Sequence, residues 1–431
     1  MRRLYARHNR LSNRNLGEFF NAPSGPVFAN EYPVNPLGCR TGEFSRQSPP
    51  DPDNSAAKPV RLVFSNYDSP RNPFYGGGGS AAIHEVARRL ARQHTVEVVI
   101  GRYRGCHWTE QDGVRYHPLG PAWAGPKLGQ LLFQFSLPVC LRQKPFDVWC
   151  ESLTPPFSTA CLQHFARQPV VALTQILGGQ AMRRKYRLPF DRVERAGLRT
   201  YRWAIATSQY LSTQLHAANP RLRVAVIPNG VSSDLVRLDS SPGGRHILFL
   251  GRIDVEQKGL DLLLEALASV AAALPLPVVL AGGGDPAQEA FVARRIRALD
   301  LAEKVRMTGR VQGTAKDQLL RDAAFLVMPS RFEASPLVMI EAFCYRLPAV
   351  LFGIPELIEV PDTCCLKVPP FDVPVLGQAL LTLARDPVLR HTMGQAAKAY
   401  AHAFDWDDLA QRYADFFETA RRESVSSAPR R

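Results

Sequence analysis

Two cations and two carboxylates in the second half of the chain have the types and the spacing needed to bind a ligand that carries both phosphate and hydroxyl groups. Arg252 and Lys258 lie inside the segment Gly251–Gly259. Arginine offers a planar fork of donors and lysine a mobile point charge, so together they suit adjacent phosphates and a diphosphate leaving group. Glu333 and Glu341 have seven residues between them. Phosphates repel such carboxylates, whereas sugar hydroxyls donate hydrogen bonds to them.

These residues follow short apolar runs that are typical of buried strands. His246–Leu250 precedes Gly251, and Phe325–Met328 precedes the loop that contains Glu333. In an open parallel sheet, ligands bind beyond the carboxyl ends of the strands. Both loops are therefore expected at that edge of one sheet.

A helix is expected directly after Glu333. Ser335 is a good N-cap and Pro336 a good first helical residue. Glu341 then lies about one and a half turns into the helix, and the free N–H groups at the helix start attract anions. Glu333 in the loop and Glu341 in the helix can therefore contact different parts of one extended ligand.

Strand-like runs alternate with helical or glycine-rich segments from residue 60 onward, which is the pattern of parallel α/β sheets. The first series consists of Val60–Ser65, the glycine run Gly76–Gly79 and a helix, then Val96–Ile100, Asp147–Trp149, Val170–Leu173, Ala204–Ala206 and Val224–Ile227. The second series consists of His246–Leu250, Pro277–Ala281, Val305–Met307, Phe325–Met328 and Ala349–Leu351. The sequence therefore predicts two doubly wound, Rossmann-like α/β domains that face each other across a cleft, with the cleft as the ligand site.

The composition predicts where these domains begin and end. Residues 1–59 are rich in Asn, Pro, Ser and Arg and lack a usable period, which indicates a flexible extension. The first domain is expected at residues 60–238 and the second at 239–403. A helix at about 404–420 is expected to cross back to the first domain, and residues 421–431 form a basic tail.

The bulk numbers favour a globular protein of more than one domain. A chain of 431 residues exceeds what a single core usually supports, and 45% apolar with 21% charged residues excludes a wholly disordered or collagen-like chain. Eight cysteines are too sparse for a disulfide scaffold and favour a reducing compartment. No secretory signal or transmembrane run is visible. The expectation is a cytoplasmic protein, or one peripheral at the cytoplasmic face of a membrane.

The positive charge predicts an anionic partner. The formal net charge is +14, and much of the excess lies in Met182–Trp203, where arginines alternate with aromatic residues. This segment suits an anionic membrane or a lipid-phosphate acceptor, and an ordinary basic surface helix is an equal alternative. Nucleic acid is disfavoured because no recognition motif accompanies the charge.

Three features together resemble glycosyltransferase family 4. They are Gly251-Arg252 with Lys258-Gly259, the spacing of Glu333 and Glu341, and the run Pro228-Asn229-Gly230-Val231. Each motif is weak alone, whereas their order and spacing are specific, and the resemblance covers residues 60 to about 420. It implies the GT-B fold and a retaining enzyme that moves a sugar from a nucleotide-diphosphate-sugar donor to a hydroxyl of a glycan or lipid-linked acceptor, in polysaccharide or glycoconjugate synthesis.

The resemblance also implies roles for individual residues. Arg252 and Lys258 would hold the donor diphosphate, Glu341 the ribose and Glu333 the transferred sugar. Because proline has no N–H, Leu337 and Val338 are the expected backbone donors at the helix start. The other implied donor-binding residues are Gly77, Gly78, Asn229, Gly309 and Arg310. Thr174 and Gln175 stand where the family often has a histidine, and are expected near the donor sugar.

Retaining members of the family are thought to let the leaving phosphate deprotonate the acceptor hydroxyl. The resemblance therefore implies catalysis through Arg252, Lys258 and Glu333, with no protein nucleophile. Neither Asp254 nor Glu151 has a partner that sequence can place. The scattered histidines lack metal-ligand spacing, so neither a metal nor another cofactor is expected.

Other functions on the same fold remain as alternatives. A phosphorylase of the cofactor-dependent kind needs a pyridoxal lysine, which cannot be identified, and a sugar-nucleotide epimerase is a second possibility. A non-catalytic sugar-nucleotide-binding protein is a third, although the presence of both cations and both carboxylates argues against it. A dinucleotide dehydrogenase is disfavoured because the glycine run lacks the required spacing and acidic partner.

Overall fold

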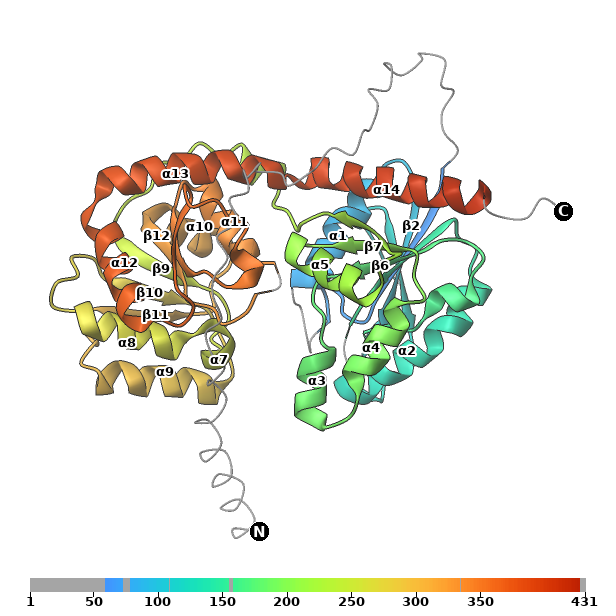
Figure 1. Ribbon diagram of the computed structural model, residues 1–431, viewed down its shortest axis with the longest axis horizontal. Coiled ribbons are helices and arrows are strands. Elements are labelled where there is room, and N and C mark those ends of the chain that lie inside the picture. The colour runs from blue at the N-terminus through green and yellow to red at the C-terminus, as the bar shows by residue number, and fades with distance from the viewer. Residues whose placement is uncertain (1–58, 73–77, 108, 155–157, 334, 427–431) are drawn as a thin grey trace, which may run out of the picture. The chain divides into compact units, whose positions relative to one another are not determined.

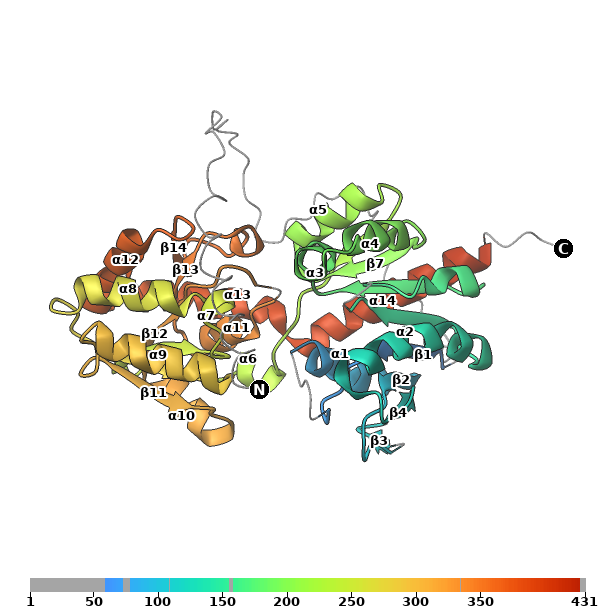
Figure 2. The same cartoon turned by 90° about the horizontal axis from the view of Figure 1, so that it is seen from below.

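The computed structural model describes residues 59–72, 78–107, 109–154, 158–333 and 335–426 (Figure 1). Residues 1–58 of the expected extension lie outside the described residues. Within the described part, two separate parallel sheets are each covered by helices (Figures 1 and 2). This confirms the predicted α/β architecture.

The first sheet has eight strands in the order β3-β4-β2-β1-β5-β6-β7-β8. Its strands are β1 (Arg61–Asn66), β2 (Thr95–Gly101), β3 (Thr109–Gln111), β4 (Val114–Leu119), β5 (Val148–Ser152), β6 (Val170–Thr174), β7 (Trp203–Ala206) and β8 (Arg223–Val226). All neighbours pair in parallel except β3 and β4. The central strands are buried on both faces, which explains their continuous apolar runs.

The antiparallel pair β3 and β4 was not predicted. Asp112 and Gly113 join the two strands and both have positive φ, 52° and 75°. An Asp-Gly pair with positive φ at both positions is the preferred two-residue hairpin turn. This dipeptide was the signal in the sequence that would have located the hairpin.

Two helical layers cover the first sheet. On one face, α1 (Gly78–Leu90) and α14 (Trp406–Ser426) share an apolar cluster with the strands. On the other face, a second cluster contains residues of α2 (Gly125–Gln143), η1 (Leu162–Phe165), α4 (Phe190–Leu198) and α5 (Gln209–Ala218). The short helix α3 (Gly179–Tyr186) precedes α4 and packs against it.

The second sheet has six parallel strands in the order β11-β10-β9-β12-β13-β14. They are β9 (His246–Leu250), β10 (Val278–Ala281), β11 (Val305–Gly309), β12 (Ala323–Met328), β13 (Ala349–Phe352) and β14 (Cys365–Val368). The edge strand β14 was not predicted, because Cys-Leu-Lys-Val is short and only two of its four residues are buried. Five of the six strands agree with the predicted runs.

Helices of the second domain pack around one continuous apolar cluster. They are α6 (Ser233–Val236), α7 (Val255–Lys258), α8 (Leu260–Val270), α9 (Pro286–Ala298), α10 (Gly313–Asp322), α11 (Leu337–Cys344), α12 (Val373–Arg385) and α13 (Pro387–Ala401), with the 3-10 turns η2 (Pro355–Leu357) and η3 (His402–Phe404). The strand-helix alternation places the carboxyl ends of β9, β10, β11 and β12 along one edge of the sheet.

The last helix, α14, completes the core of the first sheet. Trp406, Leu409, Tyr413 and Phe417 are buried in the cluster that includes β1 and β7, and the rings of Phe64 and Phe417 lie 5.9 Å apart. The predicted crossover helix therefore packs on the first sheet.

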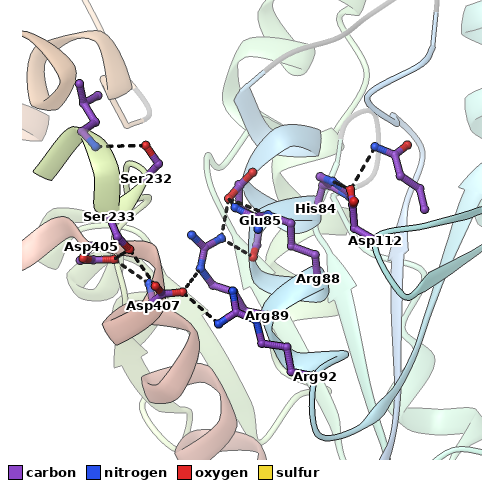
Figure 3. A network of polar contacts seen from close by, with 12 residues as sticks. His84, Glu85, Arg88, Arg89, Arg92, Asp112, Ser232, Ser233, Asp405 and Asp407 are labelled. Atoms are coloured by element: carbon purple, nitrogen blue, oxygen red, sulfur yellow. Dashed lines mark hydrogen bonds and ion pairs between the residues drawn. The ribbon is translucent and has the colours of Figure 1, made fainter. Parts of the chain in front are cut away.

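Polar contacts hold the start of α14 to α1 and α6 (Figure 3). The Arg89 guanidinium donates to the Asp407 carboxylate over 2.6 Å. The Ser233 hydroxyl lies 2.7 Å from a carboxylate oxygen of Asp405 and 2.8 Å from one of Asp407. Val231 pairs with Asp405 in an isolated bridge. The segment after β8 and the segment before α14, which are the two connections between the sheets, are therefore hydrogen-bonded to each other.

The expectation that residues 421–431 form a tail needs correction at its start. α14 continues to Ser426, and Arg421 donates to Glu418 within the helix. Such pairs three or four residues apart favour continued helix. Residues 427–431 lie outside the described part. None of the described helices combines the length and apolar character needed to cross a bilayer.

Candidate donor-binding site

The carboxyl edge of the second sheet brings the predicted cations and carboxylates together. β9 and β12 are hydrogen-bonded neighbours, so the loops that follow them are adjacent. Arg252 and Lys258 follow β9, and Glu333 follows β12. Two segments 75 residues apart in sequence therefore form one site.

Lys258 is the last residue of the short helix α7. Asp254 caps this helix by accepting from the Gln257 N–H over 3.0 Å. Gly259 follows with φ +64°, and a Cβ there would lie 1.9 Å from the Pro329 carbonyl oxygen. Only glycine allows the backbone to turn at this position while packing directly against the loop after β12.

The Lys258 ammonium donates to the Glu333 carboxylate over 2.6 Å. The Ser330 hydroxyl donates to the same oxygen over 2.5 Å. Glu333 is nearly inaccessible, with its side chain 5% exposed, whereas that of Lys258 is 18% exposed. The lysine therefore compensates a buried carboxylate and remains partly accessible to solvent.

Arg331 fastens the two loops to each other. Its N–H donates to the Gln257 carbonyl over 2.9 Å, and its guanidinium binds both oxygens of Asp261 at 2.9 and 2.7 Å. Bidentate pairs of this kind fix geometry as well as charge. Arg331 therefore acts as a positioning residue for Lys258 and Glu333, a role that its place in the sequence did not indicate.

Arg252 is held more loosely than Lys258. Its guanidinium donates to the Gln257 side chain over 2.6 Å and lies 3.4 Å from Asp254. The side chain is 63% exposed. It can therefore reorient toward an anionic ligand with little loss of internal contacts.

The helix that carries Glu341 starts one residue later than expected. Pro336 has φ −80° and ψ 81°, which is not helical, and α11 begins at Leu337 without a side-chain cap. Ser335 therefore does not cap the helix. Its carbonyl instead accepts from the Leu337 N–H over 2.9 Å, so this predicted phosphate donor already makes a hydrogen bond within the turn. Val338 follows in the first turn of α11.

Glu341 pairs with Lys316, a residue that was not predicted for the site. The Lys316 ammonium lies 2.7 Å from the Glu341 carboxylate, and both side chains are partly exposed. Lys316 belongs to α10, the helix between β11 and β12. Lys316 follows β11, whose carboxyl end lies at the same edge of the sheet, and this position in the sequence could have indicated that it lies near the site. The pair orients Glu341 before any ligand binds.

Glycines line the same edge where neighbouring loops come close. A Cβ on Gly282 would lie 1.7 Å from the Gly251 carbonyl oxygen, and one on Gly284 would lie 2.2 Å from that of Ile253. Gly309, with φ +71°, ends β11 and accepts from the Gly282 N–H. Arg310 follows directly, so the Gly309-Arg310 pair also lies at this edge.

Glu356 is a further carboxylate near Glu333. It lies in η2, after β13 at the same sheet edge. Burial, and then the negative charge of Glu333, raise the pKa of the Glu356 carboxyl. A site with two carboxylates this close suits a ligand portion rich in hydroxyl groups.

In the first domain, the Gln175 side chain contacts both the start of α1 and Asn229. Its Nε2 donates to the Gly79 carbonyl over 3.5 Å, and its Oε1 accepts from Asn229 over 3.4 Å. Gly77 lies outside the described residues. Gly78 begins α1, and a Cβ on it would lie 3.6 Å from Leu337 Cδ1.

Thr174 does not share the position of Gln175. It is fully buried at the end of β6, and its hydroxyl has no hydrogen-bond partner among the described groups. Because successive residues of a strand point to opposite faces, only one of the pair can face the glycine loop. A sugar contact by Thr174 therefore needs rearrangement, whereas Gln175 already lies at the loop.

A small pocket also lies at the carboxyl end of the first sheet. Its volume is about 160 Å³, and none of its described lining residues is acidic. The lining includes Arg71, Tyr103, His107, Gln111 and Tyr116. The His84 ring lies behind it, 2.6 Å from the Tyr116 hydroxyl and 3.1 Å from Asp112. The pocket offers aromatic, neutral polar and cationic groups to a ligand.

Glu151 and Asp254, which had no partner in the sequence, both have structural roles. Asp254 caps α7. Glu151 is 2% exposed and accepts hydrogen bonds from the Ala160 N–H and the Tyr201 hydroxyl. Burial raises the pKa of Glu151 to about 7, although these hydrogen bonds oppose the rise. Neither carboxylate is placed to act as a nucleophile.

Glu151→Gln is expected to change how stability depends on pH. The folded protein binds the Glu151 proton more tightly than the unfolded chain, so the free energy of unfolding falls as pH rises from about 4.5 to about 7. The loss is on the order of 3 kcal/mol. The variant should therefore gain in thermal midpoint relative to the wild type as pH rises from 5 to 8. A difference in thermal midpoint that stays constant from pH 5 to 8 would contradict this prediction. The control is Glu303→Gln, which changes an exposed glutamate.

Among the described residues, no three His, Cys, Asp or Glu side chains gather closely enough to hold a metal ion. The expectation that the reaction requires no metal stays a prediction.

Comparison with known families identifies the proteins to which this chain is similar. Residues 76–235 match the family described as Glycosyltransferase Family 4, and residues 244–386 match the family described as Glycosyl transferases group 1. Residues 76–235 therefore form a family 4 glycosyltransferase domain and residues 244–386 a group 1 glycosyltransferase domain. The second match contains Glu333 and Glu341, and the first contains Gly76–Gly79 and Gln175.

Relatives of the protein match parts of its length. It is 30% identical over 264 residues to the alpha-D-kanosaminyltransferase of Streptomyces kanamyceticus, covering 60% of this chain and 62% of that protein. It is 30% identical over 204 residues to the phosphatidyl-myo-inositol mannosyltransferase of Mycobacterium leprae, covering 45% of this chain and 53% of that protein. The chain thus matches between half and two thirds of the length of these relatives.

Solved structures show the same fold. Sucrose-phosphate synthase from Thermosynechococcus elongatus superposes with a TM-score of 0.71 at 19% identity, covering 84% of this chain and all of that one. Anabaena HepE, solved with UDP-glucose, superposes with a TM-score of 0.64 at 17% identity over the same shares. The protein therefore has the predicted GT-B fold.

Proposed function

We propose that the protein is a retaining glycosyltransferase that moves a sugar from a nucleoside-diphosphate sugar to a hydroxyl group of a glycan or lipid-linked acceptor. The observation that carries this proposal is the meeting of Lys258, Arg252 and Glu333 at one sheet edge, with Glu341 on the following helix. Cations and carboxylates side by side suit a ligand that is anionic in one part and rich in hydroxyls in another.

The donor would bind along this edge in three parts. Its diphosphate would take the Lys258 ammonium from Glu333 and draw in the exposed Arg252 guanidinium. The ribose hydroxyls would donate to Glu341, which Lys316 already orients. The transferred sugar would then meet Glu333, freed from its ion pair, with Glu356 nearby. HepE, whose structure was solved with UDP-glucose, shows a donor of this class on the same fold.

The protein's main contribution to the reaction would be to stabilise the leaving diphosphate. Fixed cations placed where negative charge develops lower the barrier without a covalent intermediate. The acceptor hydroxyl would lose its proton to a phosphate oxygen of the leaving group, on the face of the sugar where the new bond forms. Structural roles for Glu151 and Asp254 are consistent with this route.

The acceptor is expected on the first domain, where the pocket lined by Arg71, Tyr103 and Tyr116 offers aromatic and polar groups. One matched relative is named as an alpha-D-kanosaminyltransferase and another as a phosphatidyl-myo-inositol mannosyltransferase, and these names support a role in glycoconjugate or polysaccharide synthesis. The absence of acidic residues from the described lining of the pocket favours a neutral or anionic acceptor over a cationic one.

Glu341→Gln is expected to weaken donor binding by about 10- to 100-fold, because hydrogen bonds to a charged acceptor contribute roughly 1.5–3 kcal/mol. The variant should raise the KM for the nucleotide sugar more than it lowers kcat. A screen of nucleotide sugars for thermal stabilisation identifies the donor first. Transfer assays with lipid and oligosaccharide acceptors then measure both constants.

The control for this variant is Glu265→Gln, on the outer side of α8, where Glu265 pairs only with Arg295 in the structure's described part. Its donor KM should equal that of the wild type. Stabilisation by no nucleotide sugar would contradict the proposed function. Sugar-phosphate formation from inorganic phosphate would favour a phosphorylase, and interconversion of free nucleotide sugars an epimerase.

A further inference from the structure

The first domain has one helical face with an unusual surface. Its exposed large apolar side chains, among those described, all lie in α2, α3, α4, η1 or the adjoining loops. They are Trp123, Leu128, Phe135, Val139, Phe165, Ile176, Tyr186, Leu188 and Val193. On the opposite face, α1 and the described side chains of α14 contribute none. The asymmetry therefore belongs to one side of the sheet.

The charge on this face is equally one-sided. The helices α2, α3 and α4 contain only two acidic residues, Asp191 and Glu194. Asp191 pairs with Arg183 over 2.8 Å, and Glu194 is 7% exposed and accepts from the Gly179 N–H. Neither balances the exposed basic residues, which are Lys127, Arg142, Arg184, Lys185, Arg187, Arg192, Arg195 and Arg199. The face is apolar and cationic together.

The structure corrects the earlier view of Met182–Trp203 as one basic aromatic segment. Phe190, Tyr201 and Trp203 are buried in the domain, at 9%, 3% and 2% exposure, so they hold the segment to the sheet. Of the four aromatic residues, only Tyr186 is exposed, at 45%. The surface residues are instead those at the connection between α3 and α4.

That connection forms a tip on the first domain. Tyr186 is the last residue of α3, Arg187 and Leu188 follow it before α4, and Leu188 is 56% exposed. Arg187 has φ 58°, which turns the chain sharply. Figure 1 shows α3 at the border of its domain, beside α4. An aromatic and a leucine flanking a cation at this tip can enter the boundary between lipid headgroups and acyl chains.

We propose that this α2–α4 face docks the protein on an anionic lipid bilayer, with the Tyr186–Leu188 tip inserted at the headgroup level. Anionic headgroups complement the unpaired cations, and the acyl boundary takes the exposed apolar side chains. A nucleic acid would use the cations but leave scattered aliphatic residues such as Val139 and Val193 exposed to water. The combination of both surface types favours lipid.

Flotation of the full chain with vesicles tests the proposal. The wild type should float with vesicles of phosphatidylcholine mixed equally with phosphatidylglycerol, and should stay at the bottom with phosphatidylcholine alone. Arg184→Gln, Lys185→Gln and Arg187→Gln together should weaken binding to the anionic vesicles by about a hundredfold. Tyr186→Ser with Leu188→Ser keeps every charge but removes the apolar contacts. The binding of this variant to anionic vesicles should therefore be electrostatic alone, and high salt should abolish it.

Matched controls lie on the second domain. Arg294→Gln, Arg297→Gln and Arg306→Gln remove three exposed cations there, and Phe291→Ser with Val388→Ser removes two exposed apolar groups. These variants should float like the wild type, and all variants should keep the wild-type thermal midpoint. Failure of the wild type to float with anionic vesicles would overturn the proposal. So would equal weakening by the control variants, or binding of a single-stranded oligonucleotide with no binding of vesicles.

Discussion

Lys258→Ala should lower the rate of sugar transfer by about 10²–10³-fold, because the variant loses a cation that is placed to stabilise the leaving diphosphate. The structure adds a second consequence. Glu333 would remain buried, with its side chain 5% exposed, without its ammonium partner. Removing one member of a buried pair costs about 3–5 kcal/mol, so this variant should also melt at a lower temperature.

Two controls separate loss of catalysis from loss of stability. Lys258→Met combined with Glu333→Gln removes both charges and should recover most of the thermal midpoint while remaining inactive. Lys304→Ala removes a partly buried lysine at the opposite edge of the sheet, where its ammonium donates to the Leu274 carbonyl over 2.9 Å. It should retain near-normal turnover. Near-normal transfer by Lys258→Ala would remove Lys258 from the proposed mechanism.

Gly259→Ala should destabilise the second domain by at least about 3 kcal/mol. The added Cβ would lie 1.9 Å from the Pro329 carbonyl oxygen at a residue with φ +64°, so the loops after β9 and β12 must separate. Because Lys258 and Glu333 lie on these two loops, donor binding should be lost with stability. Thermal unfolding and nucleotide-sugar binding measure the two effects.

Gly244→Ala is the matched control for this substitution. Gly244 has φ +70°, nearly the same backbone conformation, but no heavy atom lies within 4 Å of its Cβ position. It should therefore cost only the strain of the conformation, about 1–2 kcal/mol, with donor binding unchanged. Equal losses in the two variants would mean that backbone strain, and not the contact with Pro329, explains the effect.

The position of the site at one edge of the sheet could be predicted, because the carboxyl ends of parallel strands all lie at the same edge. Once His246–Leu250 and Phe325–Met328 were recognised as strands of one sheet, Arg252, Lys258 and Glu333 had to emerge at the same end. The contacts made by side chains could not be predicted in the same way. Lys316 and Arg331 reach the site through their rotamers and through helices whose orientation depends on packing.

Local preferences misled at two positions for a physical reason. Ser335 and Pro336 suit a helix start, but Pro336 adopts a turn that precedes α11, so the N-cap preference yielded to the loop geometry. In Met182–Trp203, the alternation of arginine and aromatic residues suggested one exposed helix. The segment instead contains two helices, a turn and the first residue of β7, and burial divides its aromatic residues between core and surface.

The packing of α14 on the first sheet also has a consequence for how the protein is made. Trp406, Leu409, Tyr413 and Phe417 complete an apolar cluster with strands of the first sheet and with α1, and α1 is synthesised more than 300 residues earlier. While a ribosome translates the second domain, that cluster has none of these residues to cover it. The first domain therefore reaches its final core only when the end of the chain has left the exit tunnel, so the nascent chain must keep an incomplete domain from aggregating throughout the synthesis of its neighbour.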